Sequence, residues 1–205
     1  MARGRLVAFE GGEGTGKSTQ AERLACSLDA VLTREPGGTA AGEAVRRLLL
    51  DPEVRIDDRA EALLMAAARA QHVHDVIRPA LEAGRDVVTD RYVHSSLAYQ
   101  GYGRGLDLTE VRQLSAWATQ GLWPDVVVLL DVPAAESLAR RRAIGHAPDR
   151  LEAEDEAFHR RVVEGFAALA AADPDRWLVI DGTGSIDDVA ARVRAAFDGW
   201  AARLR

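Results

Sequence analysis

The sequence predicts an α/β protein, a three-layer α/β/α sandwich around a five-stranded parallel sheet. Short apolar runs alternate with longer helical patterns along its 205 residues. Runs such as Val126-Val-Val-Leu-Leu130 lack polar alternation, so they should be strands buried on both faces of a sheet. Because strands that alternate with helices form βαβ units with right-handed crossovers, the sheet should be parallel.

The elements follow one another in a regular series. The apolar runs predict strands at residues 5–10, 30–33, 86–90, 126–131 and 177–180. Helical patterns fill the intervals, at residues 17–28, 42–50, 59–83, 109–121, 134–142, 151–172 and 185–203. We expect the acidic run 152–156 to open its helix, where negative charge favours the helix dipole. The length suits a single domain over residues 1–205 with a small lid.

Composition narrows the class of protein. A net charge of −6 argues against a nucleic-acid partner, and no apolar stretch is long enough to span a bilayer. We therefore expect a cytoplasmic protein without membrane contacts. The single cysteine, Cys26, excludes an internal disulfide and is expected to be a buried thiol. The five histidines share no metal-ligand spacing and should be surface or packing residues.

The chain contains one lysine, Lys17, in the segment Gly11-Gly-Glu-Gly-Thr-Gly-Lys-Ser18. This matches the phosphate-binding pattern G-x-x-x-x-G-K-[ST], in which backbone N–H groups hold phosphates and the Ser hydroxyl holds Mg²⁺. A chance glycine-rich turn is the alternative, but a predicted strand before it and a helix after it favour the phosphate site. The predicted ATP-binding residues are Gly11, Gly12, Glu13, Gly14, Thr15, Gly16, Lys17, Ser18 and Thr19.

Charged residues follow several predicted strands at the point where each ends. Glu10, Arg34, Asp90 and Asp131 lie at such ends, where open α/β sheets bind their ligands. The chain has no asparagine and no second lysine, so it lacks the Asn-Lys-x-Asp motif that reads guanine. A large mechanical ATPase would need more chain. A small kinase fits best, because further arginines could hold an acceptor phosphate opposite ATP.

Three segments resemble thymidylate kinase, particularly the bacterial form with catalytic arginines in the lid. They are Thr33-Arg-Glu-Pro-Gly-Gly-Thr39, Ala67-Ala-Arg-Ala-Gln-His72 and Asp90-Arg-Tyr-Val-His-Ser-Ser-Leu-Ala-Tyr-Gln-Gly101. Their order and spacing match that family from the first strand to the helix after the lid. The resemblance implies a P-loop nucleoside monophosphate kinase fold and the reaction ATP + dTMP → ADP + dTDP in dTTP biosynthesis. It also implies a homodimer built through helices.

The resemblance assigns roles to the charged residues. It makes Arg91 and Arg34 a clamp on the dTMP phosphate, although an internal salt bridge with Asp90 or Glu35 is an alternative for either arginine. Asp90 would hold Mg²⁺ through water, opposite Ser18, since Mg²⁺ keeps several waters and needs few protein ligands. Glu10 could support the same water shell or be purely structural.

The resemblance also describes how the nucleoside would be held. Glu13 would contact the 3′-hydroxyl, and Tyr99 would pack under the sugar unless it is simply a core aromatic. Arg69 would donate to thymine O4, while Ser96 and Gln100 would reach the polar edge of the base. The family usually has a stacking phenylalanine where this chain has Met65, which puts base selectivity in question. The predicted acceptor site comprises Glu13, Arg34, Glu35, Pro36, Arg46, Met65, Arg69, Arg91, Ser95, Ser96, Tyr99 and Gln100.

Residues 140–150 form a basic stretch with Gly145 and Pro148, which predicts a mobile lid over about residues 140–152. We expect it to close over ATP and bring Arg142 or Arg150 to the γ-phosphate as an arginine finger. Arg150 resembles the family's lid arginine in its Asp-Arg-Leu-Glu context. Adjacent arginines on a helix point in different directions, so at least one should be solvated. The predicted catalytic residues are Lys17, Arg91, Arg142 and Arg150.

Two other functions fit part of this pattern. A kinase for another nucleoside monophosphate such as dUMP, or for a nucleoside, is the nearest alternative, although a nucleoside would not need two arginines on a phosphate. A nucleotide-binding regulator without turnover is the second. Intact Lys17, Ser18 and Asp90 argue against it.

Overall fold

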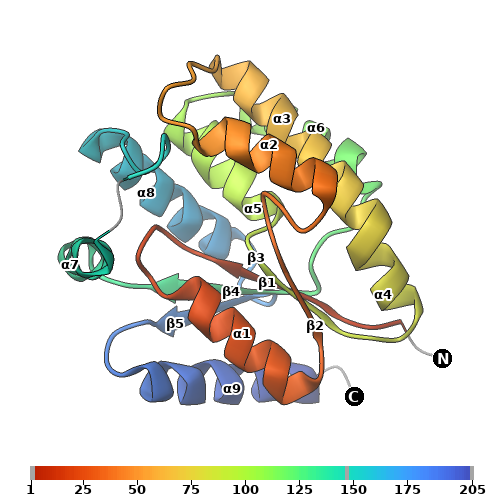
Figure 1. Ribbon diagram of the computed structural model, residues 1–205. Coiled ribbons are helices and arrows are strands. Elements are labelled where there is room, and N and C mark those ends of the chain that lie inside the picture. Colours follow the sequence, from red (N-terminus) through yellow and green to blue (C-terminus); the bar gives the residue numbers. More distant parts are fainter. Residues whose placement is uncertain (1–2, 146–147, 204–205) are drawn as a thin grey trace.

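The computed structural model describes residues 3–145 and 148–203, and omits the side chains of residues 141 and 144. Its five strands are all parallel, in the order β2-β3-β1-β4-β5. They are β1 (Leu6–Glu10), β2 (Val31–Arg34), β3 (Val87–Asp90), β4 (Val126–Asp131) and β5 (Trp177–Asp181). Helices cover both faces of the sheet (Figure 1), so the predicted α/β sandwich is confirmed.

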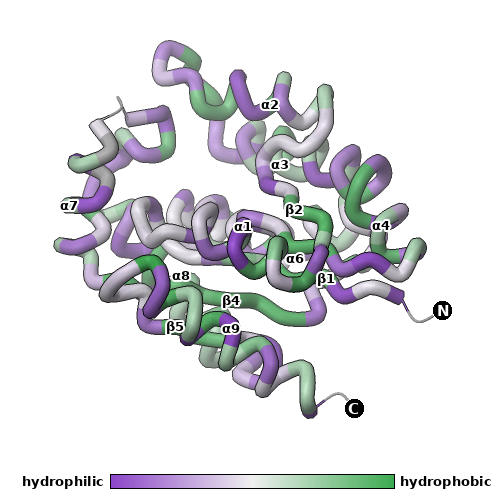
Figure 2. Tube along the Cα trace, turned by 60° about the horizontal axis from the view of Figure 1, so that its bottom comes forward, coloured by the Kyte–Doolittle hydropathy of each residue, from purple (hydrophilic) through white to green (hydrophobic). Residues whose placement is uncertain are grey.

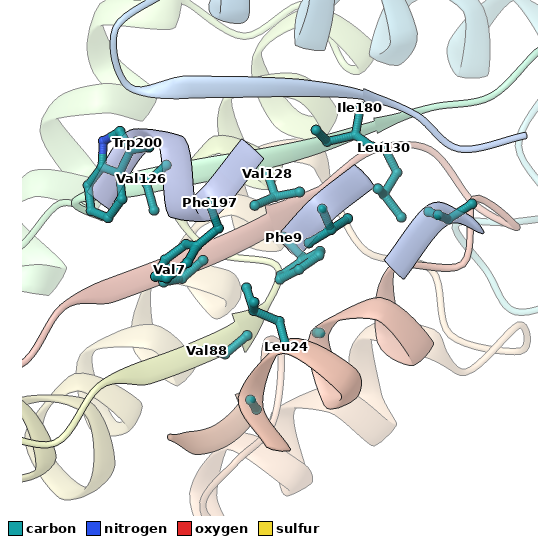
Figure 3. Packing of buried hydrophobic residues seen from close by; sticks show 14 residues of the cluster. Val7, Phe9, Leu24, Val88, Val126, Val128, Leu130, Ile180, Phe197 and Trp200 are labelled. Carbon is teal, nitrogen blue, oxygen red and sulfur yellow. The ribbon is translucent and has the colours of Figure 1, made fainter. Parts of the chain in front are cut away.

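One face of the sheet packs against two helices, α1 (Lys17–Leu28) and α9 (Ile186–Ala202). Alternate strand residues point this way, among them Phe9 and Val128, and Phe197 of α9 packs against them (Figure 3). Each strand residue of this cluster is at most 6% exposed, as expected for parallel strands covered on both sides.

The other face carries two apolar clusters. One packs β4 against α8 (Glu156–Ala172) and the π-helical segment η2 (Leu97–Gly103). The other packs β1 and β3 against helical residues within 73–81. Outside them, α2 (Ala40–Leu50), α3 (Asp58–His72) and α6 (Leu108–Thr119) lie side by side (Figure 1). Figure 2 shows β4 as a hydrophobic strand beneath more polar helices.

The predicted helix 59–83 is three segments in the structure. After α3 the chain forms a π-helical turn, η1 (Val73–Ile77), and then a short helix, α4 (Arg78–Glu82). Pro79 lies in the first turn of α4. Proline lacks an N–H and clashes with the carbonyl four residues earlier, so a wider turn relieves the helix there.

A helical stretch that the sequence did not predict follows β3. It consists of α5 (Val93–Ser96) and η2, whose residues are almost all buried. Burial on every side leaves no amphipathic period, so the usual helix signal is missing.

Two smaller predictions were wrong. The helix placed at 151–172 begins only at Glu156, because the Asp155 side chain caps it by accepting from the N–H of Phe158. Cys26 is exposed rather than buried, because α1 turns Ala21, Leu24 and Ala25 toward the sheet instead.

The strand order places the site. β1 lies between β3 and β4, where the connections of an open α/β sheet turn in opposite directions and leave a crevice. The lid region follows β4 as α7 (Ala134–Ile144) and Gly145; residues 146–147 of the predicted lid lie outside the described residues. No helix in the described ranges has the length and apolar character needed to cross a membrane.

Candidate active site

The loop between β1 and α1 presents its backbone toward the crevice. Gly11, Gly14 and Gly16 all have positive φ, which glycine adopts without strain. At Gly11 a Cβ would lie 2.9 Å from the carbonyl oxygen of Leu130, so no other residue fits there. Gly16 is the N-cap of α1 and supplies no side-chain cap. The N–H groups at this helix end are therefore oriented for an anion such as phosphate.

Lys17 lies along this loop and is only 6% exposed. Its Nζ donates to the carbonyl oxygen of Gly12 at 2.6 Å. Burial lowers the pKa of Lys17, Arg91 lowers it further, and the carboxylates of Glu13 and Asp90 act in the opposite direction. The ammonium is thus held beside the glycine loop, where a nucleotide phosphate would supply its counter-charge.

Ser18 and Asp90 form a candidate magnesium site. Ser18 Oγ donates to Asp90 Oδ2 at 2.5 Å, because the pairing of β1 with β3 brings the two loops together. Asp90 Oδ1 is buried, and among the residues that the structure describes it has no hydrogen-bond partner. A hydroxyl and a carboxylate with an unsatisfied oxygen match the hard oxygen ligands that Mg²⁺ prefers.

Glu10, at the end of β1, is bound to the loop that follows β3. Its fully buried carboxylate accepts hydrogen bonds from the backbone N–H groups of Tyr92 and Ser95 and from Ser95 Oγ. Burial raises the pKa of Glu10 to about 7, against these hydrogen bonds and the charge of Arg91, which lower it. These contacts favour the structural alternative, in which Glu10 fixes the loop after β3.

Next to the phosphate loop lies a cavity of about 180 Å³. It gathers residues from β1 to the lid, namely Glu13, Glu35, Pro36, Arg46, Leu50, Met65, Arg69, Arg91, Ser95, Ser96, Tyr99, Asp149, Leu151 and Glu152. All but two of the predicted acceptor residues are among them. The exceptions are Arg34 and Gln100.

Arg91 connects the cavity to the phosphate loop. Its backbone has φ 71°, an uncommon conformation for a non-glycine residue that points to a functional constraint. Its guanidinium donates to Glu13, to Tyr99 Oη at 3.0 Å and to the carbonyl of Gly11 at 3.1 Å. The internal salt bridge is therefore made with Glu13, rather than with Asp90 or Glu35. Burial lowers the pKa of Arg91, but the charges of Glu13, Tyr99, Asp90 and Glu10 together outweigh burial and raise this pKa.

Arg69 lines the cavity and is 2% exposed. It donates to Glu35 Oε2 at 2.6 Å and to Ser96 Oγ at 3.0 Å. The other Glu35 oxygen lies 3.0 Å from Nδ1 of His72, a packing residue whose link to the site the sequence did not reveal. This chain of contacts fixes the plane of the guanidinium, so Arg69 can present it to a ligand without reorganising.

The two predicted acceptor residues outside the cavity lining have other partners. Arg34 is half exposed and pairs with Glu43 of α2 at 3.1 Å, while Arg46 faces the cavity and donates to the carbonyl of Pro36. Gln100 is fully buried and donates to Glu61, and its Oε1 has no partner among the described residues.

The lid arginines are separated in the structure. Arg150 pairs with Glu61 at 2.6 Å, on the acceptor side of the crevice. Arg142 is exposed on α7. Arg140, which was not among the predicted site residues, donates to the carbonyl of Thr15 at 3.4 Å and so lies beside the phosphate loop. In this structure Arg150 thus contacts the acceptor side of the crevice, whereas Arg140 contacts the phosphate loop.

A family model described as thymidylate kinase matches residues 9–193. The chain belongs to the thymidylate kinase family. The thymidylate kinase of Deinococcus radiodurans is 50% identical over 201 residues, which cover 96% of this chain and 97% of that protein. That of Bifidobacterium longum is 51% identical over 201 residues, covering 94% and 96%.

A solved structure agrees with the sequence relatives. The crystal structure of thymidylate kinase from Ehrlichia chaffeensis superposes with a TM-score of 0.78 at 32% identity, covering 95% of this chain and 99% of that one. As a member of the thymidylate kinase family, the chain is a nucleoside monophosphate kinase that phosphorylates dTMP. The predictions of family, fold class and enzyme type are therefore confirmed.

Proposed function

We propose that the phosphate loop of this thymidylate kinase family member holds ATP and that the adjacent cavity holds dTMP. The observation that carries the assignment is the gathering of dispersed acceptor residues in one cavity whose wall includes Glu13 of the phosphate loop. Arg91 touches both sites, since it donates to Gly11 of the loop and lines the cavity. The arrangement supports transfer across a short gap between the two nucleotides.

Phosphoryl transfer needs in-line placement and positive charge more than it needs covalent chemistry. The acceptor is already a phosphate anion, so a strong general base is not required. Lys17 would bind the β- and γ-phosphate oxygens, and Arg91 would hold the acceptor phosphate. Glu13 keeps Arg91 charged and oriented before substrate arrives. Arg46, rather than Arg34, is the second arginine facing the cavity, so we assign it the other contact with that phosphate.

Ser18 and Asp90 would hold Mg²⁺ with ATP as the phosphate donor. The unpartnered Oδ1 of Asp90 supports this choice. When bound, Mg²⁺ would neutralise charge on the transferring phosphate. Asp90→Asn should lower kcat at saturating ATP, while the Kd for dTMP alone should change less than twofold. Unchanged turnover in Asp90→Asn would exclude this role.

For the base, we assign Arg69 of the cavity lining as a donor and Gln100, a buried residue outside that lining, as an acceptor. Arg69 would donate to thymine O4. Gln100 turns its Nε2 toward Glu61, so its Oε1 is available to accept from an N–H of the base. Thymine carries such an N–H at position 3 and cytosine does not, which supports a preference for dTMP over dCMP.

A coupled ADP-release assay tests the assignment. It should show turnover with dTMP, weaker turnover with dUMP, and little with dCMP, dGMP or thymidine. Activity confined to thymidine, or none with any acceptor, would overturn it.

We also propose a cytoplasmic homodimer that uses α2, α3 and α6. These neighbouring helices expose large apolar side chains, including Leu48, Leu63 and, at 79% exposure, Trp117. Exposed apolar groups on adjacent helices suit an interface between copies. Trp117→Asp should halve the mass measured by light scattering. The control Val179→Asp, on β5, should leave the mass unchanged, and a monomeric wild-type protein would refute the dimer.

A further inference from the structure

Arg150 is anchored to the walls of the acceptor cavity. Its Nε donates to the carbonyl of Leu49 at 2.8 Å, and its backbone N–H donates to that of Leu50 at 3.1 Å. Its Nη2 donates to Glu61 Oε2 at 2.6 Å. The side chain is only 10% exposed, so this arginine is held by a buried ion pair and two hydrogen bonds to α2.

The anchor places the lid over the cavity. Asp149, Leu151 and Glu152 flank Arg150 in sequence, and all three line the cavity. Leu50, which accepts the backbone hydrogen bond, also lines the cavity. The contacts that fix Arg150 therefore also fix the neighbouring lid residues that line the cavity.

Glu61 is built to receive this arginine. It is a fully buried residue of α3, and a buried carboxylate needs paired charges. Arg104 bonds to both of its oxygens, at 3.3 and 2.9 Å, and Gln100 donates to Oε1 at 2.8 Å. Burial raises the pKa of Glu61, but these donors outweigh burial and lower it. The lowered pKa keeps Glu61 ionised, and Arg104 is a second cationic partner of this carboxylate beside Arg150.

We infer that Arg150 and Glu61 form a clasp that closes the acceptor cavity, so that Arg150 is a positioning residue for dTMP and not the cation on the γ-phosphate. The inference rests on the proposed placement of dTMP in this cavity. It replaces the expectation from sequence that Arg150 is an arginine finger. Arg140, which donates to the phosphate loop, and Arg142, an exposed residue of the same helix α7, remain for that role.

Binding of dTMP in the absence of ATP separates the two roles, since no γ-phosphate is then present. Isothermal titration should show a Kd for dTMP at least tenfold higher in Arg150→Ala than in wild type, with Arg150→Lys between them. The matched control Arg142→Ala should bind dTMP within twofold of wild type. In steady state, Arg150→Ala should raise the KM for dTMP more than it lowers kcat.

A double-mutant cycle tests the clasp itself. Glu61→Gln should also weaken dTMP binding, and the loss in the double variant Glu61→Gln/Arg150→Ala should be less than the product of the two single losses. Unchanged dTMP affinity in Arg150→Ala with a tenfold drop in kcat would overturn the clasp and restore the arginine finger. If Glu61→Gln does not fold, the Arg150 series decides alone. Wild-type protein that fails to bind dTMP would instead overturn the placement of the acceptor, and the clasp with it.

Discussion

The donor and acceptor sides of this enzyme are built in opposite ways. The proposed donor side is one continuous stretch, residues 11–19, made of the phosphate loop and the start of α1, which offers backbone N–H groups and one lysine. The acceptor side is assembled from β2, α2, α3, α5, η2 and the lid, and its contacts come from side chains. Its arginines are each paired with a carboxylate or a carbonyl.

The difference shows what each side tolerates. A site made of backbone depends on the size of its residues, because a Cβ at Gly11 would collide with the carbonyl of Leu130 and Lys17 is buried against the carbonyl of Gly12. A site made of buried ion pairs depends on charge balance, because removing one partner leaves the other unpaired in a poorly solvated place. Substitutions that keep charge should damage the donor side, and substitutions that keep shape should damage the acceptor side.

The largest effect should come from Lys17→Arg, which keeps the charge but enlarges the head group. The ammonium lies 2.6 Å from the Gly12 carbonyl in a buried position, and a planar guanidinium does not fit there. We expect kcat to fall roughly 10³-fold. The rate of ADP release at saturating dTMP measures this kcat. Full activity would show that the donor loop accepts a head group larger than an ammonium.

Next in size is Glu35→Gln, which keeps shape but removes the charge beside Arg69. Both side chains are at most 4% exposed, so we expect a loss of about 3 kcal/mol in the free energy of unfolding. Urea denaturation measures this loss. The matched control is Glu43→Gln, in the exposed pair with Arg34, which should cost at most about 1 kcal/mol. Equal costs for the two variants would contradict the role of buried charge.

A smaller effect should appear in the pH dependence of stability, through Glu10. Its pKa rises from 4.5 to about 7 on folding. The unfolded chain therefore loses this proton at lower pH than the folded protein, and Glu10 lowers the free energy of unfolding as pH rises through that window. Relative to Glu10→Gln, wild type should lose on the order of 2 kcal/mol between pH 4.5 and 7. Parallel curves for the two proteins would show that folding does not raise the pKa of Glu10.

The smallest effect should follow Met65→Phe on the acceptor side. Met65 lines the cavity one helical turn before Arg69. Stacking of a phenyl ring on a base contributes about 0.5–1.5 kcal/mol of binding energy beyond the burial of apolar area. The KM for dTMP should therefore fall about threefold at unchanged kcat. A higher KM would mean that the ring overfills the cavity.

The same contrast explains what the sequence could predict. The donor loop is contiguous, so its pattern and its strand–loop–helix setting identified it directly. The family resemblance identified the acceptor residues, but it did not predict in which direction each of their side chains points. Arg34 and Arg46 lie on neighbouring elements, and only packing decides that Arg46 turns into the cavity while Arg34 turns to Glu43. A pattern carries no such information.

Glu61 and the segment after β3 were missed for a related reason. A glutamate four residues before Met65 has the usual appearance of a solvated helix residue, and nothing local reveals that Arg104 and Arg150 converge on it. The helical segment 93–103 is buried all round, so it lacks the period by which helices are recognised. The strands, by contrast, were placed to within one residue.

The buried position of Lys17 makes it a built-in reporter. It is the only lysine in the chain, so amine-reactive acylating reagents have this one side chain as a target. Its ammonium faces the phosphate loop and is 6% exposed, so acylation should be slow and should stop when ATP binds. In a mass spectrum, the acylated peptide that contains Lys17, separate from any peptide acylated at the N-terminal α-amino group, then reads donor-site occupancy without an engineered label on the protein.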